Sequence, residues 1–336
     1  MLNQAPALKL RQAFEADTHA WFKKQRHGHM GKWQYGEPEY KGDPVRGAEL
    51  WDIWEQAARD DNMLARQGRI IEEQIDDMVA LTQPRNTLID LGPGGIHAVL
   101  RNTIPFITGY GDDLENYIAI DLAAGASDGA VDQVGITRPE LNRVSLNDDF
   151  LKTGIHIPAT GQSVALFMGG TIGNFEAEPN TPQAIELMAQ KIIRLKQVLP
   201  PDTVVFIGLE ATQTPALLFA DYDDPRHAEY EINLMHQIKR DIIPDEAGFD
   251  PYAWKYSMAW YPDAHQFCHI AEATADQKFN MLGDRIHFPE GTQLVVDNSF
   301  KFPVLAMQRS AQMARTEYLK PFVDRDGRMA IHALKL

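Results

Sequence analysis

Residues 87–95, TLIDLGPGG, join a short apolar run to a loop that holds three glycines. An apolar run of this length is typical of a strand buried on both faces of a parallel sheet. Four further runs follow it: YIAID (117–121), RVSLN (143–147), SVALFM (163–168) and TVVFIGL (203–209). Between the last two, apolar residues at helical spacing predict a helix that Thr181 caps, Pro182 opens and Pro200 ends. Strands that alternate with helices predict an α/β fold with a Rossmann-like, doubly wound sheet.

The segments on either side of this alternating region have a different pattern. We expect an N-terminal helical part (1–80), a core (81–210), an insertion (211–302) and a return to the core sheet (303–336). The helical part and the insertion, which contains several antiparallel strands, together form a second lobe. The last residues, RMAIHALKL, alternate enough to close the core sheet at an edge.

Composition and charge limit the classes of function. The 336 residues carry a formal charge of -15, which disfavours nucleic acid and anionic membranes and favours a small, cationic substrate. No apolar run approaches the roughly 20 residues that span a bilayer, and the N-terminus does not resemble a signal peptide. The single cysteine, Cys268, fits a reducing cytoplasm. We therefore expect a cytoplasmic protein.

The glycine loop after the first strand indicates a nucleotide site. Gly92, Gly94 and Gly95 let the backbone turn sharply and let a ligand approach closely, although a plain turn would need such glycines too. A dinucleotide fingerprint would require glycine where His97 stands, and Pro93 removes a backbone N–H that a pyrophosphate would use. An NAD-type oxidoreductase is therefore disfavoured. No phosphate-binding P-loop motif occurs, so the loop suits a nucleoside without phosphates.

Acidic residues stand at the ends of the next two strands. Asp121 is placed to accept the two ribose hydroxyls, and Asp149 to accept from an adenine amine, with Phe150 beside the ring. Each aspartate could instead be a helix cap or a solvated loop residue. Together with the glycine loop, they favour S-adenosylmethionine as the cofactor.

The chain resembles a known family of enzymes. LIDLGPGG, YIAID, NDDF and above all FMGGTIGNF (167–175) are similar to the histidine-specific N-methyltransferases of the ergothioneine pathway, whose relatives methylate prenylated tryptophan. RGAELWDIW (46–54), YDDPRHAEYEIN (222–233) and DNSFKF (297–302) extend the similarity from about Tyr40 to the C-terminus. The resemblance implies a class I methyltransferase core, a substrate-holding second lobe and a monomer. It implies that Gly169 and Gly170 make room for the cofactor and that Asn174 reaches the substrate amine, although Asn174 could also be a turn residue.

The substrate residues depart from the family pattern. Where the histidine enzymes carry tyrosines, RDDNMLAR (59–66) carries Asn62 and Met63, which favours a substrate other than histidine, such as an arginine-like amine. The other substrate-binding residues that the resemblance implies are Tyr40, Tyr222, Asp297 (in place of glutamate) and Ser299. Two alternatives stay open, namely a histidine N-alpha-methyltransferase and a catalytically silent binding protein of the same fold.

Two local patterns add to these predictions. Val295, Asp297 and Ser299 alternate onto one face of a strand, and Lys301 continues that face. His27 and His29 stand two apart, but no third ligand has a recognisable spacing, so we expect no metal site.

Overall fold

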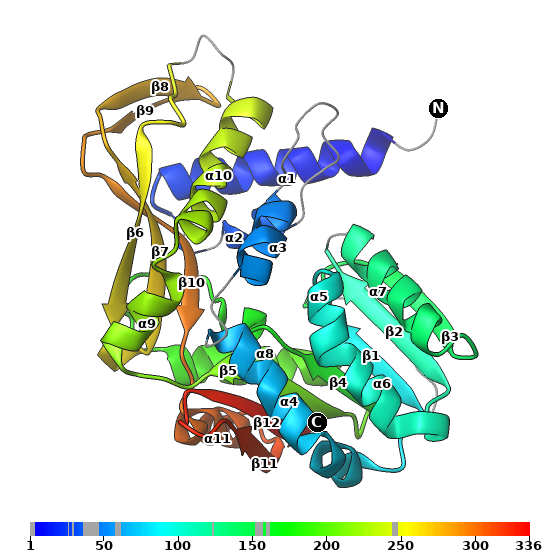
Figure 1. Ribbon diagram of the computed structural model, residues 1–336. Helices are drawn as coiled ribbons and strands as arrows, with labels where there is room; N and C mark the ends of the chain where they lie inside the picture. Colours follow the sequence, from blue (N-terminus) through cyan, green and yellow to red (C-terminus); the bar gives the residue numbers. More distant parts are fainter. Residues whose placement is uncertain are drawn as a thin grey trace. The chain divides into compact units, whose positions relative to one another are not determined.

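The computed structural model describes residues 4–25, 27–28, 30–35, 47–57, 62–122, 124–151, 157–158, 162–243 and 248–336. The chain forms two compact units (Figure 1). We call one the α+β unit; it comprises Met1–Glu55, Asn174–Pro182 and Thr214–Phe300. We call the other the Rossmann-like unit; it comprises Gln56–Gly173, Gln183–Gln213 and Lys301–Leu336.

A seven-stranded sheet forms the centre of the Rossmann-like unit, in the order β11-β12-β5-β4-β1-β2-β3. The five strands β1 to β5 are parallel, so the predicted strands and the predicted Rossmann-like α/β core are confirmed. The strands β1, β2, β4 and β5 are largely buried, whereas β3 is at an edge and has no buried residue. The bounds of all seven are β1 (Thr87–Leu91), β2 (Asn116–Asp121), β3 (Asn142–Asn147), β4 (Ser163–Phe167), β5 (Val204–Glu210), β11 (Glu317–Val323) and β12 (Met329–Lys335).

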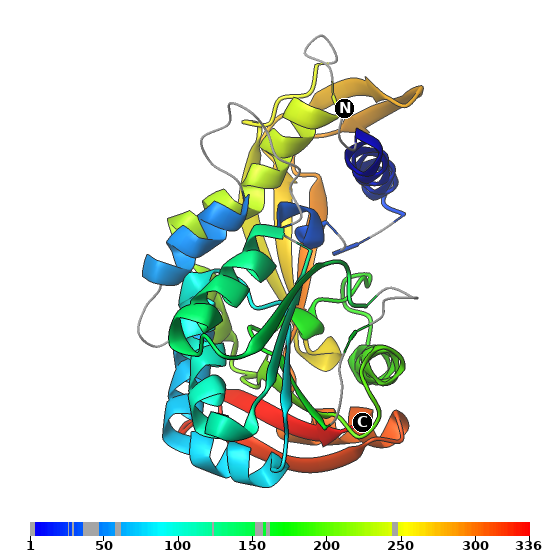
Figure 2. The same cartoon turned by 90° about the vertical axis from the view of Figure 1, so that its right-hand side faces the viewer.

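Helices cover both faces of this sheet. On one face lie α4, α6 and α7, and on the other lie α8 and α11, which pack against each other (Figure 2). The bounds are α4 (Met63–Thr82), α5 (Ile96–Ala98), η1 (Val99–Thr103), α6 (Ile104–Tyr110), η2 (Gly111–Asp113), α7 (Ala124–Thr137), η3 (Thr171–Gly173), α8 (Ala184–Val198) and α11 (Val304–Met313). Helical segments thus connect β1 to β2, β2 to β3 and β4 to β5, as expected for a doubly wound sheet.

Two details of this unit differ from the sequence predictions. The helix α8 begins at Ala184 with Gln183 as its N-cap, so Thr181 and Pro182 precede it. The strand β12 is not at an edge, because it pairs with β5 on one side and β11 on the other. Nearly all of β12 is buried, as befits an inner strand, whereas β11 forms the edge and is largely half-buried.

The α+β unit is built from helices that pack on a three-stranded antiparallel sheet, β10-β7-β6, and a separate hairpin, β8-β9. Its helices are α1 (Gln4–Phe22), α2 (Gly31–Tyr35), α3 (Gly47–Ala57), α9 (Pro215–Tyr222) and α10 (Pro225–Asp241). Its strands are β6 (Trp254–Tyr261), β7 (Gln266–Ala273), β8 (Gln277–Met281), β9 (Asp284–Phe288) and β10 (Gln293–Phe300); a short turn, η5 (Pro262–Ala264), joins β6 to β7. No described helix in the chain has the length and apolarity that a membrane span requires.

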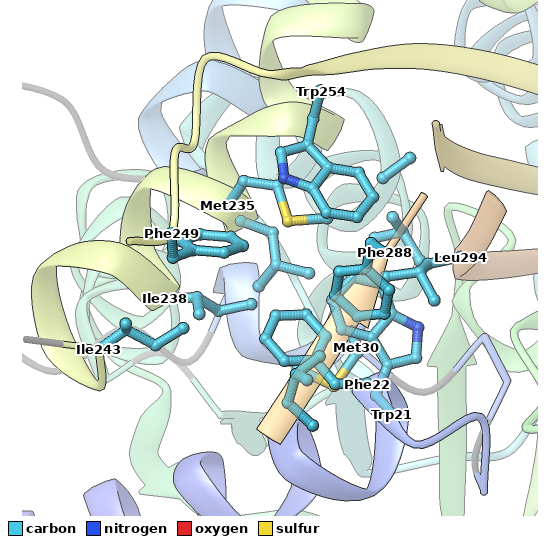
Figure 3. Packing of buried hydrophobic residues seen from close by; sticks show 14 of the residues in the cluster. Trp21, Phe22, Met30, Met235, Ile238, Ile243, Phe249, Trp254, Phe288 and Leu294 are labelled. Carbon is cyan, nitrogen blue, oxygen red and sulfur yellow. The ribbon is translucent and has the colours of Figure 1, made fainter. Parts of the chain in front are cut away.

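An aromatic core holds this unit together. The rings of Trp21, Phe22, Phe249, Trp254 and Phe288 pack among aliphatic side chains from α10 and β10 (Figure 3). Phe22 contacts Phe249 and Phe288 with ring centroids 5.8 and 5.3 Å apart. Because each such ring buries a large apolar surface, this cluster fixes α1 and α10 against the sheet.

A β-bulge in β10 changes which side chains share a face. Val295 pairs with Ile270, and Asp297 pairs with His269, so the register shifts between Val295 and Asp297. Val295 therefore packs with Cys268 and Ile270, whereas Asp297 points to the opposite face with His269. The prediction that Val295 shares a face with Asp297 is wrong, because the bulge adds one residue between them.

Candidate functional site

The glycine loop follows β1 in the Rossmann-like unit. Gly92 and Gly94 have φ angles of 72° and 71°, a left-handed region that strongly favours glycine. The N–H of Gly92 donates to the carbonyl of Ile120 at 2.8 Å, which ties the loop to the end of β2. A Cβ built on Gly92 meets no atom within 4 Å, so the side of the loop that a ligand would approach is open. Gly95 is the N-cap of α5, in an extended conformation.

A buried carboxyl lies beneath this loop. Asp90, in β1, accepts hydrogen bonds at Oδ2 from the hydroxyls of Thr103 (2.5 Å) and Tyr117 (3.1 Å). Burial raises the pKa of Asp90 to about 6, although the two hydrogen bonds oppose this shift. Asp90 thus anchors both β2 and η1 next to the glycine loop. The sequence signal that could have identified it is an acidic residue within an otherwise apolar strand.

The two predicted acidic residues lie at neighbouring strand ends. Asp121 ends β2 and is half-buried, and the side-chain amide of Asn147 donates to its carbonyl oxygen at 3.0 Å. Asp149 Oδ1 accepts from the N–H of Leu151 at 3.0 Å, so one of its oxygens takes part in a local turn. Phe150 is buried and contacts Phe167 edge to face, with ring centroids 5.1 Å apart. Their roles at the adenosine moiety stay predictions.

The glycine pair after β4 is held in place by Gln67, a residue that no local sequence pattern marks. Gly169 and Gly170 have φ angles of 77° and 80°. The N–H of Gly169 donates to Gln67 Oε1 at 3.0 Å, and Gln67 Nε2 donates to Asn102 at 3.0 Å. A Cβ on Gly208, in β5, would lie 2.0 Å from Gln67 Oε1, so Gly208 makes the room that Gln67 occupies. The buried Gln67 therefore fixes the backbone that was predicted to face the cofactor.

In the α+β unit, Asn174 and Asp297 are hydrogen-bonded to each other. Asn174 Nδ2 donates to Asp297 Oδ2 at 2.9 Å, and the N–H of Asn298 donates to Asp297 Oδ1 at 2.9 Å. Among the described residues, the side-chain amide of Asn174 therefore binds a carboxylate and does not cap a helix. A Cβ on Gly31 would lie 2.6 Å from Asp297 Cγ, so only glycine leaves space for this carboxylate.

Asn298 positions the segment that carries Asn174. Its Nδ2 donates to the carbonyls of Phe175 and Ala177, each at 2.9 Å. Its Oδ1 accepts from Gln266 Nε2 at 3.0 Å and from the thiol of Cys268 at 3.2 Å. Asn298 is fully buried, and its side-chain amide makes four hydrogen bonds. Those to Phe175 and Ala177 hold the segment 174–182 against β10.

The remaining predicted substrate residues lie near this pair or outside the described residues. Tyr222, at the end of α9, is 3% exposed and its ring lies 4.9 Å from that of His269. Ser299 is half-buried and pairs with Phe267 in β7, on the face that Asp297 and His269 share. Tyr40 lies outside the described residues.

A second carboxyl, Glu231 in α10, lies on the same face. Burial, and secondly the charge of Asp297, hold the pKa of Glu231 well above its usual range. Burial, together with the charge of Glu231, also raises the pKa of Tyr256. This part of the α+β unit therefore brings two carboxyl groups together in a region with little access to water, where a bound cation would favour their ionised forms.

Comparison with known proteins gives a consistent set of matches. A family model described as histidine-specific methyltransferase, SAM-dependent, matches residues 46–336. The histidine N-alpha-methyltransferase of Mycobacterium tuberculosis is 24% identical over 249 residues, which are 72% of this chain and 73% of that protein. The protein of the same name from Mycolicibacterium smegmatis is 24% identical over 193 residues, 56% of this chain and 57% of that protein.

The chain is also similar to solved structures of methyltransferases. One is an S-adenosylmethionine-dependent methyltransferase from Clostridium acetobutylicum, with a TM-score of 0.45, 9% identity and coverage of 86% of this chain and 98% of that one. Another is a SAM-dependent methyltransferase from Aquifex aeolicus, with a TM-score of 0.40, 10% identity and coverage of 87% and 100%.

Proposed function

The chain belongs to the family of histidine-specific, S-adenosylmethionine-dependent methyltransferases, and from this premise we propose that it methylates the amine nitrogen of an amino acid. The observation that carries the proposal is the hydrogen bond between Asn174 and the half-buried Asp297. An amide and carboxylates are the groups that recognise an amine and a cationic side chain.

The residues of the Rossmann-like unit fit S-adenosylmethionine. The left-handed backbone at Gly92 and the open space above it suit a ligand that approaches the backbone closely, and His97 and Pro93 disfavour a pyrophosphate. We propose that Gly92, Gly94 and Gly95 contact the amino acid part, with Gly169 and Gly170 beside the same ligand. In this proposal Asp121 accepts from the ribose, while Asp149 and Phe150 contact the adenine.

The chemistry requires positioning more than a nucleophilic residue. When bound, S-adenosylmethionine supplies an electrophilic methyl group. The substrate amine must be neutral and must point its lone pair at that carbon. In our proposal Asn174 holds the amine in this orientation, and Asp297, Ser299 and Tyr222 contact the rest of the substrate. Burial around Asp297 excludes water, which strengthens these polar contacts.

Histidine is the first substrate to test, because the family and both relatives are named for it. The expectation of another substrate rests on Asn62 and Met63, which replace tyrosines of the family pattern. Asn62 has a structural role, since its side chain caps α4 by accepting from the N–H of Ala65 at 2.8 Å. The negative charge of Asp297 suits histidine in its protonated form and suits arginine equally. We therefore propose an amino acid with a cationic side chain as the substrate class.

A methylation screen tests this proposal. The protein is incubated with S-adenosylmethionine and each of the twenty amino acids, and products are detected by mass. We expect methylated histidine or arginine, and at least a tenfold lower turnover for Asp297→Asn, which is about 1.4 kcal/mol in the transition state. Asp284→Asn, an exposed carboxylate of the same unit, is the matched control and should retain full turnover. Silence with all amino acids, while S-adenosylhomocysteine still binds, would contradict the proposal.

A further inference from the structure

Three buried side chains with metal-binding donors lie together in the α+β unit. His227 and Glu231 are one turn apart on α10, and His269 projects from β7. Their exposed fractions are 1%, 3% and 4%. Glu231 Oε1 lies 3.7 Å from His227 Nε2 and 3.5 Å from His269 Nδ1. One ligand atom from each residue lies within 4.8 Å of the other two.

We propose that His227, Glu231 and His269 bind a divalent transition metal ion, with Zn²⁺ as the best match to this donor set. Two imidazoles and one carboxylate are a common set of protein ligands for zinc. With metal–ligand bonds of about 2.0–2.1 Å, the ligands of a tetrahedral ion are on the order of 3.4 Å apart. The two separations from Glu231 are close to this value, and the third pair of ligand atoms, one from each histidine, lies within 4.8 Å.

The burial of the Glu231 carboxyl supports a metal ion. An isolated buried carboxylate is costly, and it is normally paired with a cation or a metal. Among the described residues, no lysine or arginine lies within ion-pair distance of Glu231; its ion-pair partners are the two histidines. Asp297, which pairs with His269 across the strands, adds a second negative charge on the same face. A bound dication would stabilise the ionised form of Glu231.

Other groups would orient the ligands. The hydroxyl of Tyr256 lies 2.7 Å from His269 Nδ1, and when an ion occupies this nitrogen the hydroxyl would turn away from it and could hold a bound water. Gln34 Nε2 is 3.5 Å from Glu231 Oε2, the oxygen that does not face the histidines. The rings of Trp54 and Tyr222 pack around His227, with centroids 5.0 and 5.1 Å away. Such a shell fixes the imidazoles and limits water access.

The proposed ion would cross-link α10 to β7, a structural role that goes beyond the methyl transfer. The sequence predicted no metal site, since His27 and His29 have no third ligand at a recognisable spacing. The spacing that this prediction overlooked is the i, i+4 pair His227 and Glu231, which places two donors on one face of a helix.

Metal analysis of the purified full-length chain tests the inference. After dialysis against metal-free buffer and incubation with Zn²⁺, elemental analysis should find about one ion per chain. Glu231→Gln should lower the bound metal at least tenfold. His236→Gln, which changes another histidine of α10, should retain it. Because Glu231→Gln could also fail to fold, wild-type protein is loaded with Co²⁺ in parallel, and visible bands of tetrahedral Co²⁺ should appear.

Two outcomes would overturn the proposal. One is a folded wild-type protein that retains no stoichiometric metal, shows no tetrahedral Co²⁺ spectrum and has the same melting temperature with Zn²⁺ and with a chelator. The other is a metal-free protein that histidine or arginine stabilises in a Glu231-dependent way, since the cluster would then be part of the substrate site. Neither outcome depends on whether methyl transfer is observed, so this test is separate from that of the proposed function.

Discussion

Replacing Gln67 by leucine should destabilise the Rossmann-like unit and weaken cofactor binding. Gln67 is fully buried, and its amide makes two hydrogen bonds of 3.0 Å each, one from the N–H of Gly169 and one to Asn102. Leucine would leave both hydrogen-bonding partners unsatisfied, which destabilises the fold by about 1–3 kcal/mol for each partner. Burial of the leucine side chain would offset part of this destabilisation. We expect a net loss of about 2–4 kcal/mol in the free energy of unfolding.

Chemical denaturation measures this loss, and titration with S-adenosylhomocysteine measures the effect on the Gly169 turn. Gln74→Leu is a matched control on the same helix, because Gln74 makes one partly buried bond of 3.3 Å to the carbonyl of Val323. The control should lose less than about 1 kcal/mol. If Gln67→Leu lost no more than Gln74→Leu and bound S-adenosylhomocysteine equally well, the positioning role of Gln67 would be refuted.

Asp90, Gly31 and Asp121 provide three further tests. The folded pKa of Asp90, about 6, exceeds its ordinary value of 3.8, so its stabilising contribution is present at low pH and is lost as the pH rises through about 6. Relative to Asp90→Asn, the wild type should lose up to roughly 3 kcal/mol of unfolding free energy between pH 4 and 7, and a constant difference would contradict the burial argument. Gly31→Ala should lower turnover by displacing the Asp297 carboxylate, which would lie 2.6 Å from the new Cβ, and normal turnover would show that this carboxylate can move freely. Asp121→Ala should weaken S-adenosylhomocysteine binding by about 2–4 kcal/mol in a calorimetric titration, and an unchanged dissociation constant would remove Asp121 from the ribose site.

The core strands were predictable because their burial dictates their composition. The sequence of a strand that is buried on both faces, such as β1 or β5, is a largely continuous apolar run. The edge strand β11 was missed because Lys320 and Pro321 interrupt any apolar pattern. The residues of β12 were predicted to form a strand but were placed at the edge, since sequence alone does not reveal that β11 pairs beyond it.

The candidate site was predictable only where local patterns or resemblance carry information. Strand-end glycines and aspartates predict cofactor-binding residues, and the resemblance predicts that Asn174 and Asp297 belong to one site. Contacts between elements far apart in the chain leave no such pattern. Gln67, which supports Gly169, was therefore missed. Asn298 was also missed, because its four hydrogen bonds are to residues that lie at least 30 positions away in the sequence.

The fate of a labelled methyl group tests the central claim most directly. The protein is given S-adenosylmethionine with a deuterated methyl group, together with histidine or arginine, and tandem mass spectrometry locates the label. The account predicts that the intact deuterated methyl group appears on an amine nitrogen of the amino acid, and that Asn174→Ala abolishes this transfer while S-adenosylhomocysteine still binds. A label on oxygen or carbon, or undiminished transfer by Asn174→Ala, would contradict it.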